Sequence, residues 1–320
     1  MKSHLAMLLT ILAASFVLVG SSPSAQAQKL AGPNRPAAVP QGYVITPFGY
    51  FHPYCVREVA SGGTVLADGR VQHADGTVDA EAPVCNYPRY TARGEIVTVG
   101  IKPPTISYSW IEDGEAVNTT SSFGELTANW TVPPAPTTKD GQVVYLFPWM
   151  EDYGNTETII QPVLGWGAAP DEEPYWTIAS WNCCPSGTAN YSTPLQVNPG
   201  DTLYGTIEST CSSGTISCPK WDITTEDRTI RQSTTLWDTP SEGQTFNWAG
   251  GGALEVYEIA ECSDYPPNQS ITFSNLELYD YNFKKYPRPG WVFFIDLAPG
   301  STPQCNYGGT TTEMTVTLDY

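Results

Sequence analysis

Two short apolar segments of the sequence each carry one polar side chain suited to hydrolysis. Gln161 lies in Glu157-Thr-Ile-Ile-Gln-Pro-Val-Leu-Gly-Trp166, and Glu255 lies in Gly252-Ala-Leu-Glu-Val-Tyr-Glu-Ile-Ala-Glu261. Apolar surroundings disfavour the charged form of a carboxyl group, which raises its pKa and suits it to general acid–base work. A glutamine amide can donate a hydrogen bond where an oxyanion develops, while its carbonyl holds a water molecule. Together the two groups have the chemistry for water attack on a carbonyl.

Other hydrolytic arrangements are excluded by what the chain lacks. Its only histidines are His4, His52 and His73, so the region after residue 73 has no Ser-His-Asp triad, Cys-His pair or histidine-ligated metal. The sequence also lacks the G-x-S-x-G, H-E-x-x-H, Asp-Thr-Gly, Asp-Ser-Gly and Walker A motifs, and it has no pair of CxxC motifs. We therefore expect no metal and no cofactor. Glutamic peptidases, two-carboxylate glycosidases and sugar-binding modules remain.

The region that must position Gln161 and Glu255 has an all-β pattern. Runs of β-branched and aromatic residues alternate with Gly, Pro, Asn and Asp clusters, and no amphipathic helix of normal length is evident. So many short strands in one region predict a two-sheet antiparallel β-sandwich, a concanavalin-like jelly roll. The expected strands are 125–132, 143–149, 158–166, 176–181, 202–208, 220–223, 254–260, 271–279, 291–296 and 312–318.

Strand alternation divides the Glu255 segment into two faces. Glu255 and Tyr257 share one face, and Leu254, Val256 and Glu258 share the other. Each glutamate therefore has apolar companions. The alternative for Glu255 is an ordinary surface carboxylate, and the alternative for Gln161 is a glutamine on a solvated strand face.

Tryptophans and glycines near these segments suggest a groove. Trp149 and Trp166 are candidates to bind substrate, either a peptide or sugar rings, and core packing is the alternative for each. Gly250-Gly251-Gly252 would permit close approach of a substrate, although such a run is more often a flexible turn. The acidic run Asp171-Glu172-Glu173 is typical of a solvated loop.

The first residues have the pattern of a secretory signal. Lys2 and His4 precede an apolar run from Leu5 to Gly20, and a small-residue cleavage site follows at Ala25-Gln26-Ala27. The run is short for a membrane span of roughly 20 residues. We expect residues 1–27 to be a signal peptide, the mature protein to be secreted and extracellular, and no membrane span to remain after signal removal.

Cysteine usage agrees with export. All eight cysteines lie beyond the signal, and an even number outside the cytosol predicts disulfide bonds. We expect Cys55–Cys85 and Cys262–Cys305. The pairing of the remaining four stays open: Cys183, Cys184, Cys211 and Cys218.

Charge and turn signals divide the exported chain into two parts. Residues 28–103 have a net charge of +1, from seven Lys/Arg and six Asp/Glu, and contain two Asp-Gly turns between Cys55 and Cys85. Residues 104–320 have a net charge of −20, from seven Lys/Arg and twenty-seven Asp/Glu. This charge argues against nucleic acid as a partner and relaxes as carboxylates protonate in acid. We expect a monomer with a small disulfide-stapled β module or prosegment at 28–103, including a linker at Pro103-Pro104, and a β-sandwich peptidase-like domain at 104–320.

The order of several segments resembles that of the eqolisins, which are secreted acid glutamic peptidases. The matching segments are Glu125-Leu-Thr-Ala-Asn-Trp-Thr-Val-Pro133, Trp149, Ile160-Gln161, Asn198-Pro-Gly-Asp201 and Leu254–Glu261. The resemblance covers most of 105–320. It implies a two-sheet sandwich made as a preproprotein, with 28–103 as the prosegment, Gln161 and Glu255 as the catalytic pair and Trp149 in the groove.

The chain also departs from the family pattern. Pro162 and Val163 follow Gln161 where eqolisins soon have an Asp, and Val256 follows Glu255 where they have an aromatic residue. The neprosin-like peptidases look related but carry Glu at the position of Gln161. Gln161 therefore points to eqolisin chemistry.

The expected function is a secreted acid endopeptidase that acts on polypeptides at roughly pH 2–5. Glu255 would serve as general base and Gln161 would stabilise the oxyanion, while acid would weaken the hold of the 28–103 segment on the domain. The alternative is a carbohydrate-binding β-sandwich module without peptidase activity, which the departures motivate. A third possibility is a glycosidase that pairs Glu255 with Glu151, Asp152 or Glu157.

Overall fold

A computed structural model of the chain describes residues 34–82, 84–97, 110–118, 120–168, 170, 172–184, 187–295, 303 and 305–320, with the backbone alone at 155–157. The expected signal peptide at 1–27 and the linker at 103–104 lie outside the described residues. Within them the regular structure is almost entirely β-strand, joined by 3₁₀ turns at Pro53–Cys55 and Cys262–Asp264.

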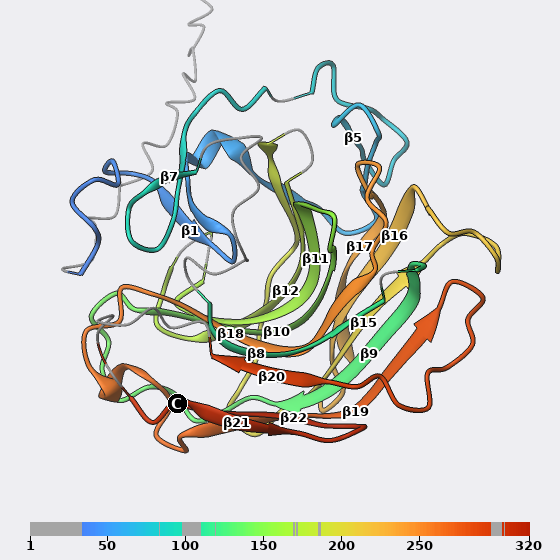
Figure 1. Cartoon of the computed structure of the whole chain (residues 1–320). Helices are drawn as coiled ribbons and strands as arrows, with labels where there is room; N and C mark the ends of the chain where they lie inside the picture. Colours follow the sequence, from blue (N-terminus) through green and yellow to red (C-terminus); the bar gives the residue numbers. More distant parts are fainter. Residues whose placement is uncertain are drawn as a thin grey trace, which may run out of the picture.

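Two nine-stranded sheets pack face to face and form the sandwich (Figure 1). The first runs in the order β20 (Val292–Ile295), β8 (Trp110–Val117), β18 (Trp248–Tyr257), β10 (Val143–Asp152), β11 (Asn155–Trp166), β12 (Trp176–Cys183), β13 (Ala189–Ser192) and β3 (Val56–Val59), with β14 (Leu195–Gln196) beside β12. The second runs in the order β21 (Gly308–Thr311), β22 (Val316–Asp319), β19 (Ser270–Asp280), β9 (Phe123–Thr131), β15 (Thr202–Ser209), β16 (Lys220–Asp227), β17 (Gln232–Pro240), β4 (Thr64–Val65) and β5 (Val71–Gln72).

The main core fills the space between these sheets. Alternate residues of β10, β11 and β18 point into it, among them Leu146, Ile160 and Leu254, and they meet Leu126 and Ile207 of the second sheet. The two-sheet sandwich expected from the sequence is thus confirmed, and each of the ten expected runs overlaps an observed strand.

Strands β8 and β17 were not expected from the sequence. Strand β8 carries Glu112, Asp113 and Glu115, so it does not read as an apolar run, yet Glu112 and Asp113 are buried. Strand β17 is rich in Thr and Ser and ends at Pro240. Tertiary pairing overrides the weak local pattern in both strands.

The glycine run lies in the middle of β18 and is not a turn. An ideal Cβ at Gly250 would lie 1.8 Å from Trp149 Nε1, and one at Gly252 would lie 2.1 Å from Phe273 Cδ2. Glycine is required because large rings pack directly against the backbone on both faces of the strand. The run therefore makes room for aromatic side chains of the protein itself.

Residues 34–97 form the N-terminal module. Its own sheet has the order β1 (Val44–Thr46), β2 (Gly49–Phe51), β6 (Arg89–Tyr90) and β7 (Ile96–Val97). Its other strands extend the sandwich, since β3 pairs with β13 and β4 pairs with β17. Both of these pairings are parallel, unlike the antiparallel sandwich that the sequence predicts. The module therefore folds as part of the sandwich and not beside it.

Disulfides agree with the expected pairs. Cys55–Cys85 closes the module and Cys262–Cys305 ties the end of the chain to the loop after β18, so both predictions are confirmed. The pairs that the sequence left open are Cys183–Cys184 and Cys211–Cys218.

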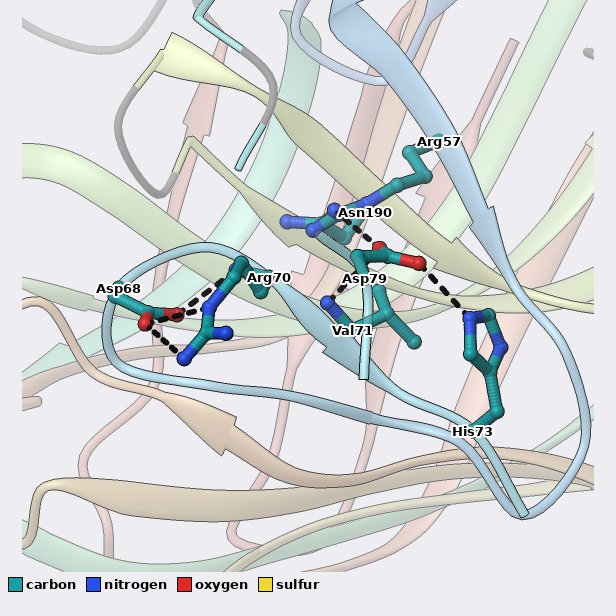
Figure 2. Close-up of polar contacts among 7 residues, drawn as sticks. All are labelled: Arg57, Asp68, Arg70, Val71, His73, Asp79 and Asn190. Carbon is teal, nitrogen blue, oxygen red and sulfur yellow. Dashed lines mark hydrogen bonds and ion pairs between the residues drawn. The ribbon is translucent and has the colours of Figure 1, made fainter. Parts of the chain in front are cut away.

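Polar contacts at β3 add to the attachment of the module (Figure 2). Arg57 donates from Nε and Nη2 to Asn190 Oδ1 on β13, at 3.0 and 2.9 Å. Arg57 Nη1 also lies 3.7 Å from Asp79 Oδ2, and Asp79 Oδ1 lies 2.8 Å from His73 Nε2. These contacts bind a turn of the module to the edge of the first sheet.

A row of carboxylates crosses the outer face of the second sheet. Glu125 on β9 lies directly opposite Glu208 on β15, which in turn lies opposite Asp222 on β16. Partial burial, followed by the charges of Glu208 and Glu277, raises the pKa of Glu125 from 4.5 to about 7. Like charges on directly opposed strand positions repel, so this face is destabilised when its carboxyls are ionised.

We predict that Glu125→Gln stabilises the protein at pH 8 but not at pH 4. The pKa of Glu125 is raised in the folded state, so its protonated form favours folding. This contribution to stability is fully present below pH 4.5 and is lost as the pH rises through about 7. The substitution removes the repulsion and should add about 1–2 kcal/mol to the free energy of unfolding at pH 8, after allowance for solvent screening. Thermal unfolding at both pH values measures this, with Glu173→Gln at an exposed position as control. Equal stabilisation at both pH values would contradict the prediction.

Candidate active site

Gln161 and Glu255 project from the same face of the first sheet. Their strand neighbours Ile160 and Leu254 point into the core between the sheets, so both polar side chains point to the opposite, concave side. That side has its own core, built by aromatic residues of the sheet and by the N-terminal module. Both Gln161 and Glu255 are fully buried there, so neither is a surface residue.

The two residues lie on the strands that flank β10. Glu255 pairs with Tyr145 of β10. On the other side of β10, Leu146 pairs with Leu164 and Met150 pairs with Ile160 of β11. This register brings Gln161 alongside Trp149, which lies four positions after Tyr145 on β10. Figure 1 shows β10, β11, β12 and β18 curving strongly, with the N-terminal module on their concave side. Both side chains therefore lie on the concave face, with Tyr145 and Trp149 of β10 between their strands.

Two aromatic groups hold the carboxylate of Glu255. Trp110 Nε1 donates to Glu255 Oε2 at 3.0 Å, and the hydroxyl of Tyr257 donates to Glu255 Oε1 in a short hydrogen bond. Tyr257 is two residues from Glu255 and shares its face, as alternation predicts. Trp110 comes from β8 and had no sequence signal that linked it to Glu255. Together the donors orient the carboxylate.

Trp149 stands at the centre of an aromatic row beside Gln161. Its ring lies edge to face with those of Trp110 and Trp248, with both pairs of ring centroids 5.0 Å apart. These rings are buried and pack edge-on, so they do not present an open face on which a sugar could stack. Among the described residues, Trp149 Nε1 and Gln161 Oε1 are buried without a hydrogen-bond partner.

Trp166 does not belong to this site, and its expected place in the groove is wrong. It lies five residues from Gln161 along the same strand, and an odd offset reverses the face. Its ring packs in the core between the sheets against Trp176, at a centroid distance of 5.5 Å.

Glu151 is another buried acidic group on the concave face. It lies on β10 between the strands of Gln161 and Glu255, two positions from Trp149. Burial is the main cause that raises its pKa well above the ordinary value, and the nearby charge of Arg89 opposes this. Sequence reasoning named Glu151 only as a glycosidase partner, because nothing local shows which carboxylates a curved sheet gathers.

Arg89 brings a positive charge from the N-terminal module into this acidic group. Burial lowers the pKa of Arg89, and the neighbouring Tyr257, Glu255 and Glu151 oppose this effect. The guanidinium lies over the ring of Phe51, 5.5 Å from the centroid. Arg89 thus balances part of the negative charge that the concave face buries.

The β1–β2 hairpin of the module covers the site directly. Gln161 Nε2 donates to the backbone carbonyl of Pro47 at 3.4 Å, and the hydroxyl of Tyr145 donates to the carbonyl of Ile45 at 3.0 Å. The ring of Tyr50 lies edge to face with that of Tyr257, at 5.4 Å. The hairpin therefore contacts Gln161 itself and two neighbours of Glu255, namely Tyr145 on β10 and Tyr257 on β18.

A buried ion pair fastens the hairpin at the end of β18. Arg35 Nε lies 2.8 Å from Glu258 Oε1, and these side chains are only 7% and 1% exposed. Alternation fails at Glu258 because its φ of 57° ends the strand, so its side chain turns to the module and not into the sandwich core. Glu172 was expected in a solvated loop, but its Oε1 accepts a hydrogen bond from the backbone N–H of Ile45 in the hairpin, at 3.0 Å.

The pH response of the cover follows from its buried carboxyl groups. Burial raises the pKa of Glu258 and of Glu151 despite the opposing charges of Arg35 and Arg89. A pKa raised in the covered state means that protonation favours that state, so these contributions are present in acid and are lost as the pH rises. Acid therefore does not loosen the module through these two groups, contrary to the expectation from net charge.

No group of histidine, cysteine and acidic side chains suited to hold a metal ion occurs among the described residues. In the same part of the chain, no helix is long and apolar enough to cross a membrane.

Comparison with solved structures finds similarity to glutamic peptidases. Scytalido-glutamic peptidase, with a peptide-based transition-state analog, matches with 13% identity and a TM-score of 0.49 over 66% of this chain and 98% of that chain. SCP-B, a member of the eqolisin family in complex with the tripeptide Ala-Ile-His, matches with 14% identity and a TM-score of 0.45 over the same shares. Aspergilloglutamic peptidase from Aspergillus niger matches with 17% identity and a TM-score of 0.35 over 55% of this chain and 98% of that chain.

These structures belong to the family that the sequence motifs resemble. No protein-family model matches the chain, and no curated protein sequence matches it.

We predict that Arg35→Leu loosens the β1–β2 hairpin. The substitution leaves Glu258 buried without its cation, and breaking a buried ion pair costs about 3–5 kcal/mol. Hydrogen–deuterium exchange of the amides in 44–51 should therefore accelerate by about 100-fold or more at pH 7.

Arg70→Leu provides the matched control for Arg35→Leu. Arg70 pairs with Asp68 in the same module, but these side chains are 38% and 54% exposed (Figure 2). An exposed pair contributes about 0–1 kcal/mol, so exchange at 44–51 should stay near the wild-type rate. Unchanged exchange in Arg35→Leu would show that the buried pair does not hold the hairpin.

Proposed function

We propose that the protein is a secreted acid endopeptidase that hydrolyses peptide bonds with Gln161 and Glu255. One observation carries the proposal. Gln161 and Glu255 come from separate strands and share the buried concave face of one sheet, where the Gln161 amide already donates to a peptide carbonyl. An amide that binds a peptide carbonyl in its ground state is placed to stabilise the oxyanion that forms there.

In the proposed reaction Glu255 acts first as general base. It takes a proton from a water molecule, whose oxygen attacks the carbonyl carbon of the peptide bond and forms a tetrahedral intermediate. Gln161 Nε2 donates to the oxyanion of that intermediate. The protonated Glu255 then gives its proton to the leaving nitrogen as the carbon–nitrogen bond breaks, which restores the carboxylate.

Trp110 and Tyr257 act in this scheme as positioning residues. Their hydrogen bonds to the two oxygens of Glu255 hold the carboxylate in one orientation. Acid conditions suit the protein because the carboxylate row at Glu125 is less repulsive when protonated.

Loss of the pair should abolish proteolysis. We expect kcat/KM for casein at pH 3 to fall by about 10²–10⁴ in Glu255→Gln and by about 10²–10³ in Gln161→Ala. Matched controls are Glu173→Gln and Gln232→Ala, both at exposed positions, which should keep wild-type rates. Cleavage rates and product masses measure the effect, and thermal unfolding checks that each variant is folded.

The same experiment separates the alternatives. Wild-type rates in both variants would remove the assignment, and loss of activity in Glu151→Gln with retention in Glu255→Gln would move the base to Glu151. Binding on a glycan array without proteolysis would instead support a carbohydrate-binding module. Hydrolysis of glycosides that depends on Glu255 and Glu151 would support a glycosidase.

We also propose that residues 28–103 are a prosegment that must be cut before substrate can enter. The module covers Gln161, and the buried carboxyls of Glu258 and Glu151 beneath it do not favour release in acid, so we expect opening to require cleavage of the chain. Incubation of the exported protein at pH 3 should produce new N-termini near residue 104 before activity appears. A stable full-length product with full activity would contradict this and support a permanent accessory module.

A further inference from the structure

The tip of the β1–β2 hairpin lies in the candidate site in the manner of a bound peptide. Pro47 and Phe48 form the two-residue turn between β1 and β2, and Thr46 Oγ1 donates to the carbonyl of Gly49 across it, at 3.0 Å. The carbonyl that accepts from Gln161 Nε2 belongs to the Pro47–Phe48 peptide bond. Phe48 is therefore the residue that follows the bond at the proposed oxyanion position.

The ring of Phe48 meets an aromatic surface next to Gln161. Its centroid lies 6.2 Å from that of Trp181, with the planes at 68°. Trp181 on β12 is the direct cross-strand partner of Gln161, so the backbone register places them side by side. Tyr191 supports Trp181, because its ring stacks on that of Trp181 with the centroids 4.7 Å apart.

This surface is built to hold an aromatic group. Trp181 and Tyr191 come from neighbouring paired strands, and they are 1% and 5% exposed with the hairpin in place. A T-shaped contact between two rings favours an aromatic guest over an aliphatic one of similar area, because the positive edge of one ring meets the negative face of the other. The surface thus distinguishes guests by shape and by charge distribution.

We propose that Trp181, supported by Tyr191, is the subsite that selects the residue following the scissile bond, and that it prefers an aromatic side chain there. Phe48 fills this subsite in the covered state and mimics the substrate. The proposal rests on the proposed function for its meaning in catalysis, but the contact of Trp181 with an aromatic guest can be tested without any turnover.

The binding test uses exchange of the hairpin amides in 44–51 as its readout. Phe48→Ala and Trp181→Leu should each accelerate exchange. Because both substitutions remove the same contact, the rate increase in the double variant should be about twofold to tenfold smaller than the product of the two single increases. Phe294→Ala changes an exposed aromatic residue on β20, away from the module, and should leave this exchange unchanged. Multiplicative effects of the two substitutions would overturn the contact.

Free peptide should compete with the hairpin for the same subsite. The probe is an N-acetylated, C-amidated alanine hexapeptide with phenylalanine at position four, and the all-alanine hexapeptide is its control. We expect the phenylalanine peptide to accelerate exchange at 44–51 in the Gln161→Ala variant, which does not consume the probe, and Trp181→Leu added to that variant to abolish this response. Equal responses to the two peptides would overturn the proposed preference.

Cleavage kinetics test the specificity after the prosegment is cut. Wild type should cleave before phenylalanine at least about tenfold faster than before alanine, measured as kcat/KM. Trp181→Phe should retain the preference, and Trp181→Leu should bring the ratio towards one. Absence of a preference would overturn the subsite, whereas absence of any cleavage would overturn the proposed function and leave the exchange tests to decide the contact.

Discussion

Burial of both faces of the first sheet is the constraint on which the rest of the structure depends. A sheet in a two-layer sandwich normally has one face against its partner and one face in solvent. Here the second face is covered by the N-terminal module, whose residues Ile45, Tyr50 and Phe51 join a core with Phe147 and Trp149. Every polar group on that face must therefore find its partners within protein.

Several polar groups on the covered face meet this requirement through contacts between distant segments. Glu255 is held by Trp110 from another strand, and Glu258 by Arg35 from the module. Gln161 gives its amide to a carbonyl of the hairpin tip. These contacts make the module part of the fold and explain why a segment with little core of its own is ordered. They also place several carboxyl groups in apolar surroundings, which is the physical origin of their raised pKa values.

Electrostatics act in the same direction at two separated places. On the outer face of the second sheet, the opposed carboxylates Glu125 and Glu208 repel when ionised. Beneath the module, protonation of Glu151 and Glu258 removes the free-energy cost of burying their negative charges. Both effects favour the compact covered protein in acid. Through these groups, low pH therefore does not by itself favour uncovering of the candidate site.

Strand alternation and β propensity are local, so the sequence alone determined much of the fold. It predicted the two-sheet sandwich, ten of the strand positions and two disulfides, and it placed Tyr257 on the face of Glu255. It also singled out Gln161, Glu255 and Trp149, which the structure brings to one face of one sheet. Their roles remain proposals.

Only the tertiary structure decided what depends on pairing between distant segments. Strand β8 joins the sheet although its acidic residues hide its pattern, and it supplies Trp110 to Glu255. Trp166 faces the sandwich core because its odd offset from Gln161 reverses the face, and Glu258 turns to the module because the strand ends at a positive φ. Parallel pairing of the module, and the entry of its hairpin tip beside Gln161, follow from long-range register. No local pattern encodes that register, because it is set by which faces become buried together.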